Sequence, residues 1–223
     1  MKLLKKEWGR AMETHGFMSG VNNMLEWISR LALLNILWIG FSLLGFIVLG
    51  FYPATVAMYA VVRRWAMGDF EAPVFSVFWS SYKSEFVKSN MFGAVISLIG
   101  IILFIDFLFL KQASTMVQNL LNVPFLIISL IFICTLLYVF PMYVHFNMKT
   151  LDILKNSFFV MVMNPFKTLI MLISSLGLVS LLSFAPPLMI VCSGNVLALV
   201  MSKPAMNAFN KVNKKHESVT VHQ

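Results

Sequence analysis

Residues 51–65 read FYPATVAMYAVVRRW, and the path of this stretch decides the topology of everything after it. It follows the first long apolar run and carries no charge before Arg63. A helix of this length spans about 22 Å, which is less than the roughly 30 Å hydrocarbon core of a bilayer. Gly50 is suited to end one helix and Pro53 to begin the next, because proline in a first turn loses no intrahelical hydrogen bond. The sequence therefore predicts a helical hairpin whose second helix either crosses the membrane or lies on its surface.

The positions of the lysines and arginines favour the crossing helix. If residues 51–65 cross, the chain has six spans with both termini on one side, and all 17 lysines and arginines except Lys111 share that side. If they do not cross, the cations of residues 63–88 and 149–167 face outward. This arrangement contradicts the usual excess of cations on the cytoplasmic side. We therefore predict that the segment crosses and that both termini are cytoplasmic.

The composition indicates an integral membrane protein. Hydrophobic residues make up 59% of the 223 residues and charged residues only 12%. Several apolar runs are close to twenty residues long, which is the length that a spanning helix needs. The net charge of +8 comes from cations that flank these runs, so it predicts contact with anionic lipid head groups and argues against nucleic acid. Cys134 and Cys192 lie inside apolar runs without metal-ligand or redox spacing, which is typical of small packing residues.

The expected fold is an all-α polytopic transmembrane bundle of about six membrane-embedded helices, the second of them short, with amphipathic cytoplasmic surface helices. We divide the chain into an amphipathic cytoplasmic segment (residues 1–27), one transmembrane domain (28–203) and a basic cytoplasmic tail (204–223). The expected spans are residues 28–50, 51–65, 91–110, 123–140, 166–184 and 188–201.

Two surface helices are predicted between these spans. Aromatic residues recur at positions 75, 78, 79, 82 and 86, which places them on one face of a helix. This helix is expected to lie at the membrane surface and to run on into the span that begins near residue 91. A similar amphipathic pattern covers residues 147–156. Residues 111–122 are polar and are expected to form a short external connection.

Three polar residues inside apolar runs are candidate sites. Asp106 is the acid that lies furthest inside such a run, where acids often line a pathway for protons or substrate. It is also about five residues from the outer end of its helix, so it can reach the interface or Lys111, and we favour this interpretation. For Asn35 and Asn195 we favour hydrogen bonds between helices over ligand binding.

The chain shows no motif that carries enzyme chemistry. It has no HExxH, no Gly-rich phosphate loop, no G-x-S-x-G elbow and no catalytic Cys–His arrangement, and its histidines are scattered. We therefore predict no catalytic, cofactor-binding or metal-binding residues, and we expect that the protein is not an enzyme.

The segment YPATVAMYAVVRRW at residues 52–65 resembles the signature of the YesL-like family of bacterial membrane proteins, also called domain of unknown function 624. As in that family, Gly68, an aromatic stretch and a lysine-bearing helix follow, and the resemblance covers nearly the whole chain. Phe51 and Tyr52 stand where the family pattern has a smaller residue before the proline. The signature residues here are Pro53, Ala54, Thr55, Arg63, Arg64 and Trp65.

The resemblance implies a multi-pass protein of the bacterial cell membrane, in a family often encoded beside genes for carbohydrate uptake and degradation. On that basis we expect a non-enzymatic accessory or regulatory component of a solute uptake system. Its expected partner is a carbohydrate ABC-type permease or a second copy of this chain. The alternative is a small solute transporter in its own right, for which Asp106 and a weak echo between residues 52–53 and 140–141 are the supporting features.

Overall fold

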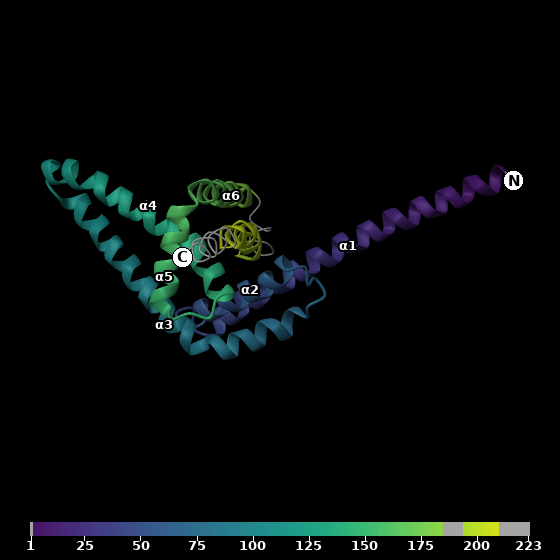
Figure 1. Cartoon of the computed structure of the whole chain (residues 1–223), viewed down its shortest axis with the longest axis horizontal. Coiled ribbons are helices and arrows are strands. Elements are labelled where there is room, and N and C mark those ends of the chain that lie inside the picture. Colours follow the sequence, from purple (N-terminus) through teal and green to yellow (C-terminus); the bar gives the residue numbers. More distant parts are fainter. Residues whose placement is uncertain (1, 185–193, 210–223) are drawn as a thin grey trace, which may run out of the picture.

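The computed structural model describes the backbone of residues 2–184 and 194–209, and the side chains of these residues from position 22 onward. Within these ranges every regular element is a helix, which confirms the predicted all-α class (Figure 1). The elements are α1 (Lys2–Leu44), α2 (Phe51–Ala66), α3 (Val74–Gln112), α4 (Thr115–His145), α5 (Thr150–Met163), α6 (Pro165–Ser183) and a last helix at residues 194–209.

The described chain contains four helices long and apolar enough to span a membrane, so the predicted number of six spans is not supported. They are Asn22–Leu44 within α1, Val74–Gln112, Thr115–His145 and Pro165–Ser183. The second predicted span corresponds to α2, which has only 16 residues. The sixth, at residues 188–201, lies partly outside the described residues.

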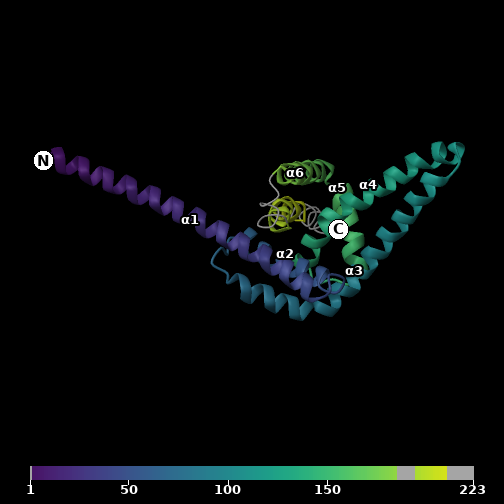
Figure 2. The ribbon, with the colours of Figure 1, turned by 180° about the vertical axis from the view of Figure 1, so that it is seen from behind.

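Helix α1 is continuous from Lys2, so the predicted surface segment is not separated from the first span. Its N-terminal part extends well beyond the other helices (Figures 1 and 2). The helix ends at Leu44 and not at Gly50, and residues 45–50 form a tight turn in which Phe46 and Ile47 have positive φ angles. Gly45 and Gly50 pack so closely that a Cβ atom on either would collide with backbone. The turn therefore depends on this glycine pair.

Helix α2 is the most enclosed element of the fold. Ten of its 16 residues are buried, and it runs antiparallel beside α1. At one end the rings of Trp27 and Trp65 pack edge to face with centroids 5.5 Å apart, and further along Trp38 Nε1 donates a hydrogen bond of 3.0 Å to Thr55 Oγ1. Because protein covers α2, it needs neither the length nor the lipid-facing surface of a typical span.

A bulky residue before Pro53 fits because α3 makes room for it. The ring of Tyr52 lies directly against Gly93 of α3, where any Cβ would overlap the ring, and its hydroxyl lies 2.6 Å from Ser97 Oγ. The turn itself therefore needs no small residue before Pro53, because Gly93 on the facing helix leaves the space that the Tyr52 ring occupies.

Helix α3 joins the predicted surface helix and the following span into one element, as expected, and it bends between the part beside α2 and the part beside α4 (Figures 1 and 2). Part of the aromatic stripe that was expected to lie at the membrane surface packs against α1, while Phe75 and Trp79 are exposed. The ring of Phe41 lies 5.4 Å from Phe78 and 5.0 Å from Tyr82, and both of these residues are buried.

The second part of α3 and the first part of α4 form a hairpin that projects from the molecule (Figures 1 and 2). Only residues 113–114 separate the two helices, so the predicted polar connection at 111–122 is mostly helical. Helix α4 also continues past Pro141, its expected end, to His145. The hairpin exposes many large apolar side chains, as a lipid-facing surface does, among them Ile101, Phe104, Ile105, Leu120 and Leu126.

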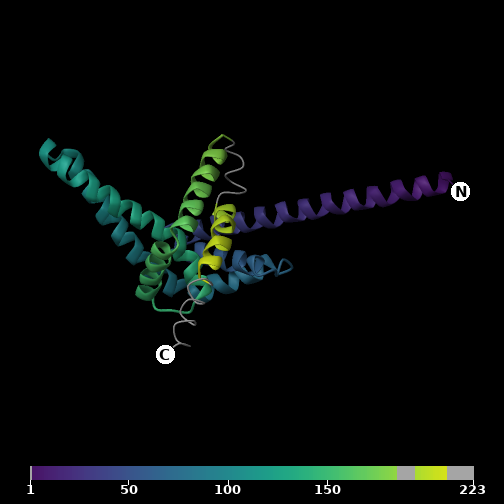
Figure 3. The same cartoon turned by 45° about the horizontal axis from the view of Figure 1, so that its top comes forward.

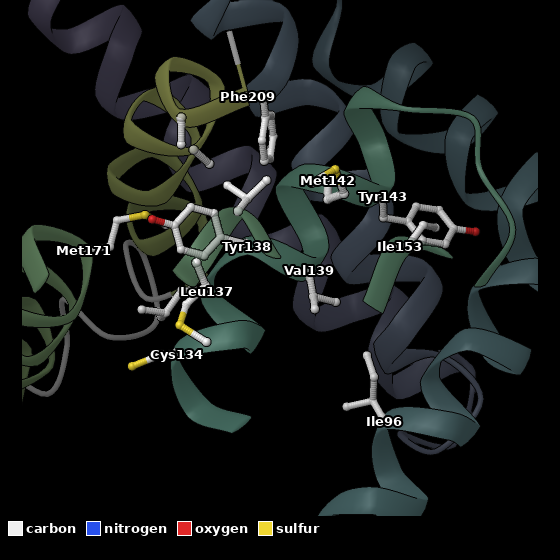
Figure 4. Close-up of a cluster of buried hydrophobic side chains, with 14 of the residues drawn as sticks. Ile96, Cys134, Leu137, Tyr138, Val139, Met142, Tyr143, Ile153, Met171 and Phe209 are labelled. Atoms are coloured by element: carbon white, nitrogen blue, oxygen red, sulfur yellow. The ribbon is translucent and has the colours of Figure 1, made fainter. Parts of the chain in front are cut away.

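A second cluster of buried side chains joins α4, α5, α6 and the last helix (Figure 4). Tyr138 of α4 and Thr168 of α6 share a buried hydrogen bond of 3.0 Å between their hydroxyls. α6 lies beside residues 194–209 (Figures 1 and 3). Phe209, in the segment that was predicted to be a basic cytoplasmic tail, is helical and buried in this cluster.

The contact between Gly93 and Tyr52 yields a stability prediction. Gly93→Ala should destabilise the protein by about 1–3 kcal/mol, because the new methyl group overpacks a ring that is anchored at both ends. Gly100→Ala, on the same helix with open space around it, should be neutral or stabilising because alanine favours helix. Thermal unfolding in detergent measures both, and equal behaviour of the two variants would contradict the packing described here.

Candidate functional site

A polar cleft of about 320 Å³ opens where α2, α3 and the end of α4 meet. Helix α2 supplies one wall, α3 supplies the second, and the last turn of α4 with the loop after it supplies the third. The lining residues are Val56, Ala60 and Arg63 from α2, Ser81, Ser84, Glu85 and Lys88 from α3, and residues 143–147.

Arg63 is fixed in the cleft by the burial of the helix that carries it. It lies in the last turn of α2, where a cation is favoured by the helix dipole. Its Nη1 donates a hydrogen bond of 2.8 Å to the carbonyl oxygen of Val144, one of the last carbonyls of α4 that have no partner within that helix. Among the described residues this is the one hydrogen bond that the Arg63 side chain makes, and its buried Nε has no partner there. Arg63 therefore caps α4 and keeps unused donors.

The α3 wall presents a lysine and a carboxylate one turn apart. Tyr143 donates a hydrogen bond of 2.8 Å from its hydroxyl to Glu85 Oε2. Lys88 Nζ donates to Asn147 Oδ1 at 3.2 Å and lies 5.4 Å from the centre of the Tyr143 ring. None of the ion pairs found in the described chain includes Arg63, Lys88 or Glu85. The cleft therefore contains two cations and one carboxylate, which gives it a net positive charge.

His145, the last residue of α4, lies on the third wall of the cleft. Its ring packs against Phe146 and Phe209, with centroids 4.7 Å and 5.7 Å away. Its Nδ1 is buried and has no hydrogen-bond partner among the described residues. The histidine that seemed isolated in the sequence thus lies beside Arg63 in a shared cleft.

An adjoining groove of about 630 Å³ shares Ser84, Lys88 and Asn147 with the cleft. Its other lining residues are the apolar Val87, Met91 and Met148 and the polar Lys149 and Thr150. Val87 and Met91 are both well exposed. The cleft is cationic, and the groove adds exposed apolar side chains together with a further lysine, Lys149.

Of the six signature residues, only Arg63 lines the cleft. Arg64 points elsewhere and lies 3.7 Å from Asp69 in a half-exposed ion pair. Trp65 is buried against Trp27. The remaining signature residues Pro53, Ala54 and Thr55 are buried packing positions of α2.

Asp106 is not part of this site. It is exposed on the α3–α4 hairpin, where it borders a mainly apolar pocket with Pro124 and Phe125. It forms none of the ion pairs of the described chain. The expected partner Lys111 instead places its ammonium group 4.7 Å from the centre of the Phe107 ring.

The two asparagines also lie outside the cleft, and both are buried. Asn195 Nδ2 donates a hydrogen bond of 2.5 Å to the carbonyl oxygen of Leu31 in α1. This bond ties the last described helix to the first one. Asn195 thus makes a contact between two helices.

Sequence reasoning did not select Glu85, Lys88, Tyr143 or Asn147. They come from segments about sixty residues apart, and no motif or period relates them. Within the described chain, no group of three histidine, cysteine, aspartate or glutamate side chains is placed to hold a metal ion.

Comparison with known proteins places the chain in a family. It is 39% identical over 203 residues to the uncharacterized protein YesL of Bacillus subtilis (strain 168), covering 91% of this chain and 96% of the relative. The chain belongs to the YesL-like family, DUF624. The family described as "Protein of unknown function, DUF624" matches residues 31–107. These residues include the cleft's α2 and α3 walls.

Two further relatives come from the same organism. The uncharacterized protein YteU is 41% identical over 175 residues, which are 78% of each chain, and the uncharacterized protein YesV is 34% identical over 192 residues, which are 86% of this chain and 92% of the relative. No solved structure matches the chain. The family membership predicted from residues 52–65 is thus confirmed.

Proposed function

We propose that this protein is a non-enzymatic accessory or regulatory component of a solute uptake system, with a carbohydrate as the solute. The genomic setting implied by the family resemblance supports the association with uptake. The placement of the charged residues is the observation that favours an accessory role over that of a transporter. Arg63, Glu85 and Lys88 line a cleft at the ends of α2 and α4, while Asp106 lies on the apolar hairpin. Transport pathways usually have polar groups along the interior of a bundle.

The proposed partner is a carbohydrate ABC-type permease, and a second copy of the chain is the alternative. The α3–α4 hairpin offers the membrane-embedded surface for this contact. Its apolar side chains are exposed, and Gly100 leaves space on it into which another helix could pack. Anionic lipids are expected around the basic helix ends.

Affinity purification of the tagged, full-length protein from native membranes in a mild detergent tests this proposal. We expect a permease to co-purify with the wild type. Gly100→Leu should reduce its recovery, whereas Gly177→Leu, at an equally open position on α6, should not. Purification without a permease, together with solute flux by the protein alone in liposomes, would replace the proposal with the transporter alternative.

Asp106→Asn separates the two functions in cells. The amide should be tolerated or slightly stabilising, because it removes a charge from an apolar helix. We expect the variant to reach the membrane at the wild-type level and to restore the solute-dependent phenotype of a deletion strain. A normally folded variant that behaves like the deletion would show that the carboxylate is required and would favour a transporter.

We further propose that the protein resides in the bacterial cell membrane with cytoplasmic termini and that α2 returns across the bilayer. The distribution of lysines and arginines supports this orientation. The antiparallel packing of α1 and α2 supports the crossing. The turn at residues 45–50 lies at one end of α2. Near the other end, Arg30 of α1 donates a hydrogen bond to the carbonyl oxygen of Phe70.

Cysteine labelling tests this topology. Val48→Cys and Phe70→Cys are each placed in a background without Cys134 and Cys192, and both positions are exposed. An impermeant maleimide should modify position 48 in intact cells and position 70 only after the membrane is opened. Modification of both positions from the same side would show that α2 does not cross.

A further inference from the structure

We propose that the cleft between α2, α3 and α4 is a binding site for a ligand that bears a phosphate group, held by Arg63, Lys88 and the adjoining polar side chains. This inference does not depend on the proposed role in solute uptake. It is based on the charge of the cleft, on its unused donors and on the groove that continues from it.

The cleft attracts anions because its cations are not neutralised. Arg63 and Lys88 line one cavity, and neither forms an ion pair with an acid in the described chain. The one carboxylate of the cleft, on Glu85, already accepts a hydrogen bond from Tyr143. An anion would supply the missing counter-charge in a partly enclosed site, where charges interact more strongly than in open water.

The available donors suit a phosphate group. Arg63 uses one N–H on Val144, which leaves most of its planar fork for a tetrahedral oxyanion. Lys88 uses one of its three N–H groups on Asn147. Charge-assisted hydrogen bonds of arginine and lysine to phosphate oxygens are among the strongest in proteins. These two residues approach the cavity from different helices, so an anion could be held from two sides.

The shape of the site fits a ligand larger than a bare ion. A cavity of about 320 Å³ is at the lower end of the range of small-molecule sites, roughly 300–1,000 Å³. The neighbouring groove continues from Lys88 toward Val87, Met91 and Met148. A phosphate in the cleft can therefore belong to a soluble phosphate ester or to a lipid head group whose apolar part follows the groove.

Lys88 is the residue on which the inference is tested. Arg63 also caps α4, so a variant there changes the fold as well as the charge of the cleft. Lys88 makes one exposed hydrogen bond, to Asn147, and lies 5.4 Å from the centre of the Tyr143 ring. Lys83 provides the matched control because it lies on the same helix with its ammonium 5.3 Å from the Trp79 ring, does not line the cleft and loses the same charge on substitution.

The experiment titrates the purified full-length protein in an uncharged detergent at constant ionic strength. The probes are inorganic phosphate and glycerol 3-phosphate by calorimetry, and dioleoylphosphatidylglycerol against dioleoylglycerol, which lacks the phosphate, by native mass spectrometry. We expect Lys88→Gln to weaken phosphate-dependent binding about tenfold or more, as the loss of a charged hydrogen bond does, and Lys83→Gln to leave it unchanged. Binding of the soluble probes identifies a free phosphate ester, and binding of the lipid alone identifies a head group.

A second measurement uses the wild-type protein and does not depend on the folding of a variant. The bound probe should slow acylation of Lys88 by an amine-reactive reagent, read by peptide mass spectrometry, while Lys83 reacts at its free rate. The inference is overturned if no phosphate probe binds, if Lys88→Gln and Lys83→Gln weaken binding equally, or if phosphate fails to protect Lys88.

Discussion

The rest of the structure depends on the enclosure of α2 between α1 and α3. A helix satisfies its own backbone hydrogen bonds, so a short helix at membrane depth requires only that its sides be covered. Here α1 covers one side through the aromatic and polar contacts of Trp27 and Trp38, and α3 covers another through the fit of Tyr52 on Gly93. The glycine pair Gly45 and Gly50 makes the return from α1 possible.

This enclosure also positions the cleft. Because α2 is held along its whole length, the position of its last turn is fixed, and Arg63 reaches the end of α4 at the point where the final carbonyls of that helix lack partners. One cation thus links the region that matches the family, residues 31–107, with the later part of the chain. The glycine-dependent turn at one end of α2 therefore helps to fix the position of Arg63 at the other end.

The sequence predicted the features that depend on local pattern. The all-α class, the helical hairpin that leads into α2, the continuity of α3 and the start of α6 near residue 166 all follow from apolar length and from proline and glycine. The number of spans could not be predicted this way, because hydropathy does not reveal whether protein or lipid covers α2. The cleft could not be predicted either, since Glu85 and Tyr143 are 58 residues apart and meet only in the fold.

Asp106 and Lys88 show why isolation in the sequence is a poor guide to a site. Asp106 stands out because its neighbours in the chain are apolar, but in the fold it borders an apolar pocket on a projecting hairpin. Lys88 is unremarkable in a polar stretch, yet α3 brings it to the end of α4 and to the same cavity as Arg63 and His145. What a side chain can bind depends on the other groups that the fold places beside it. In this protein these groups come together at the end of α4, where the backbone provides an unpaired acceptor for Arg63 and the following loop provides the side-chain acceptor Asn147 for Lys88.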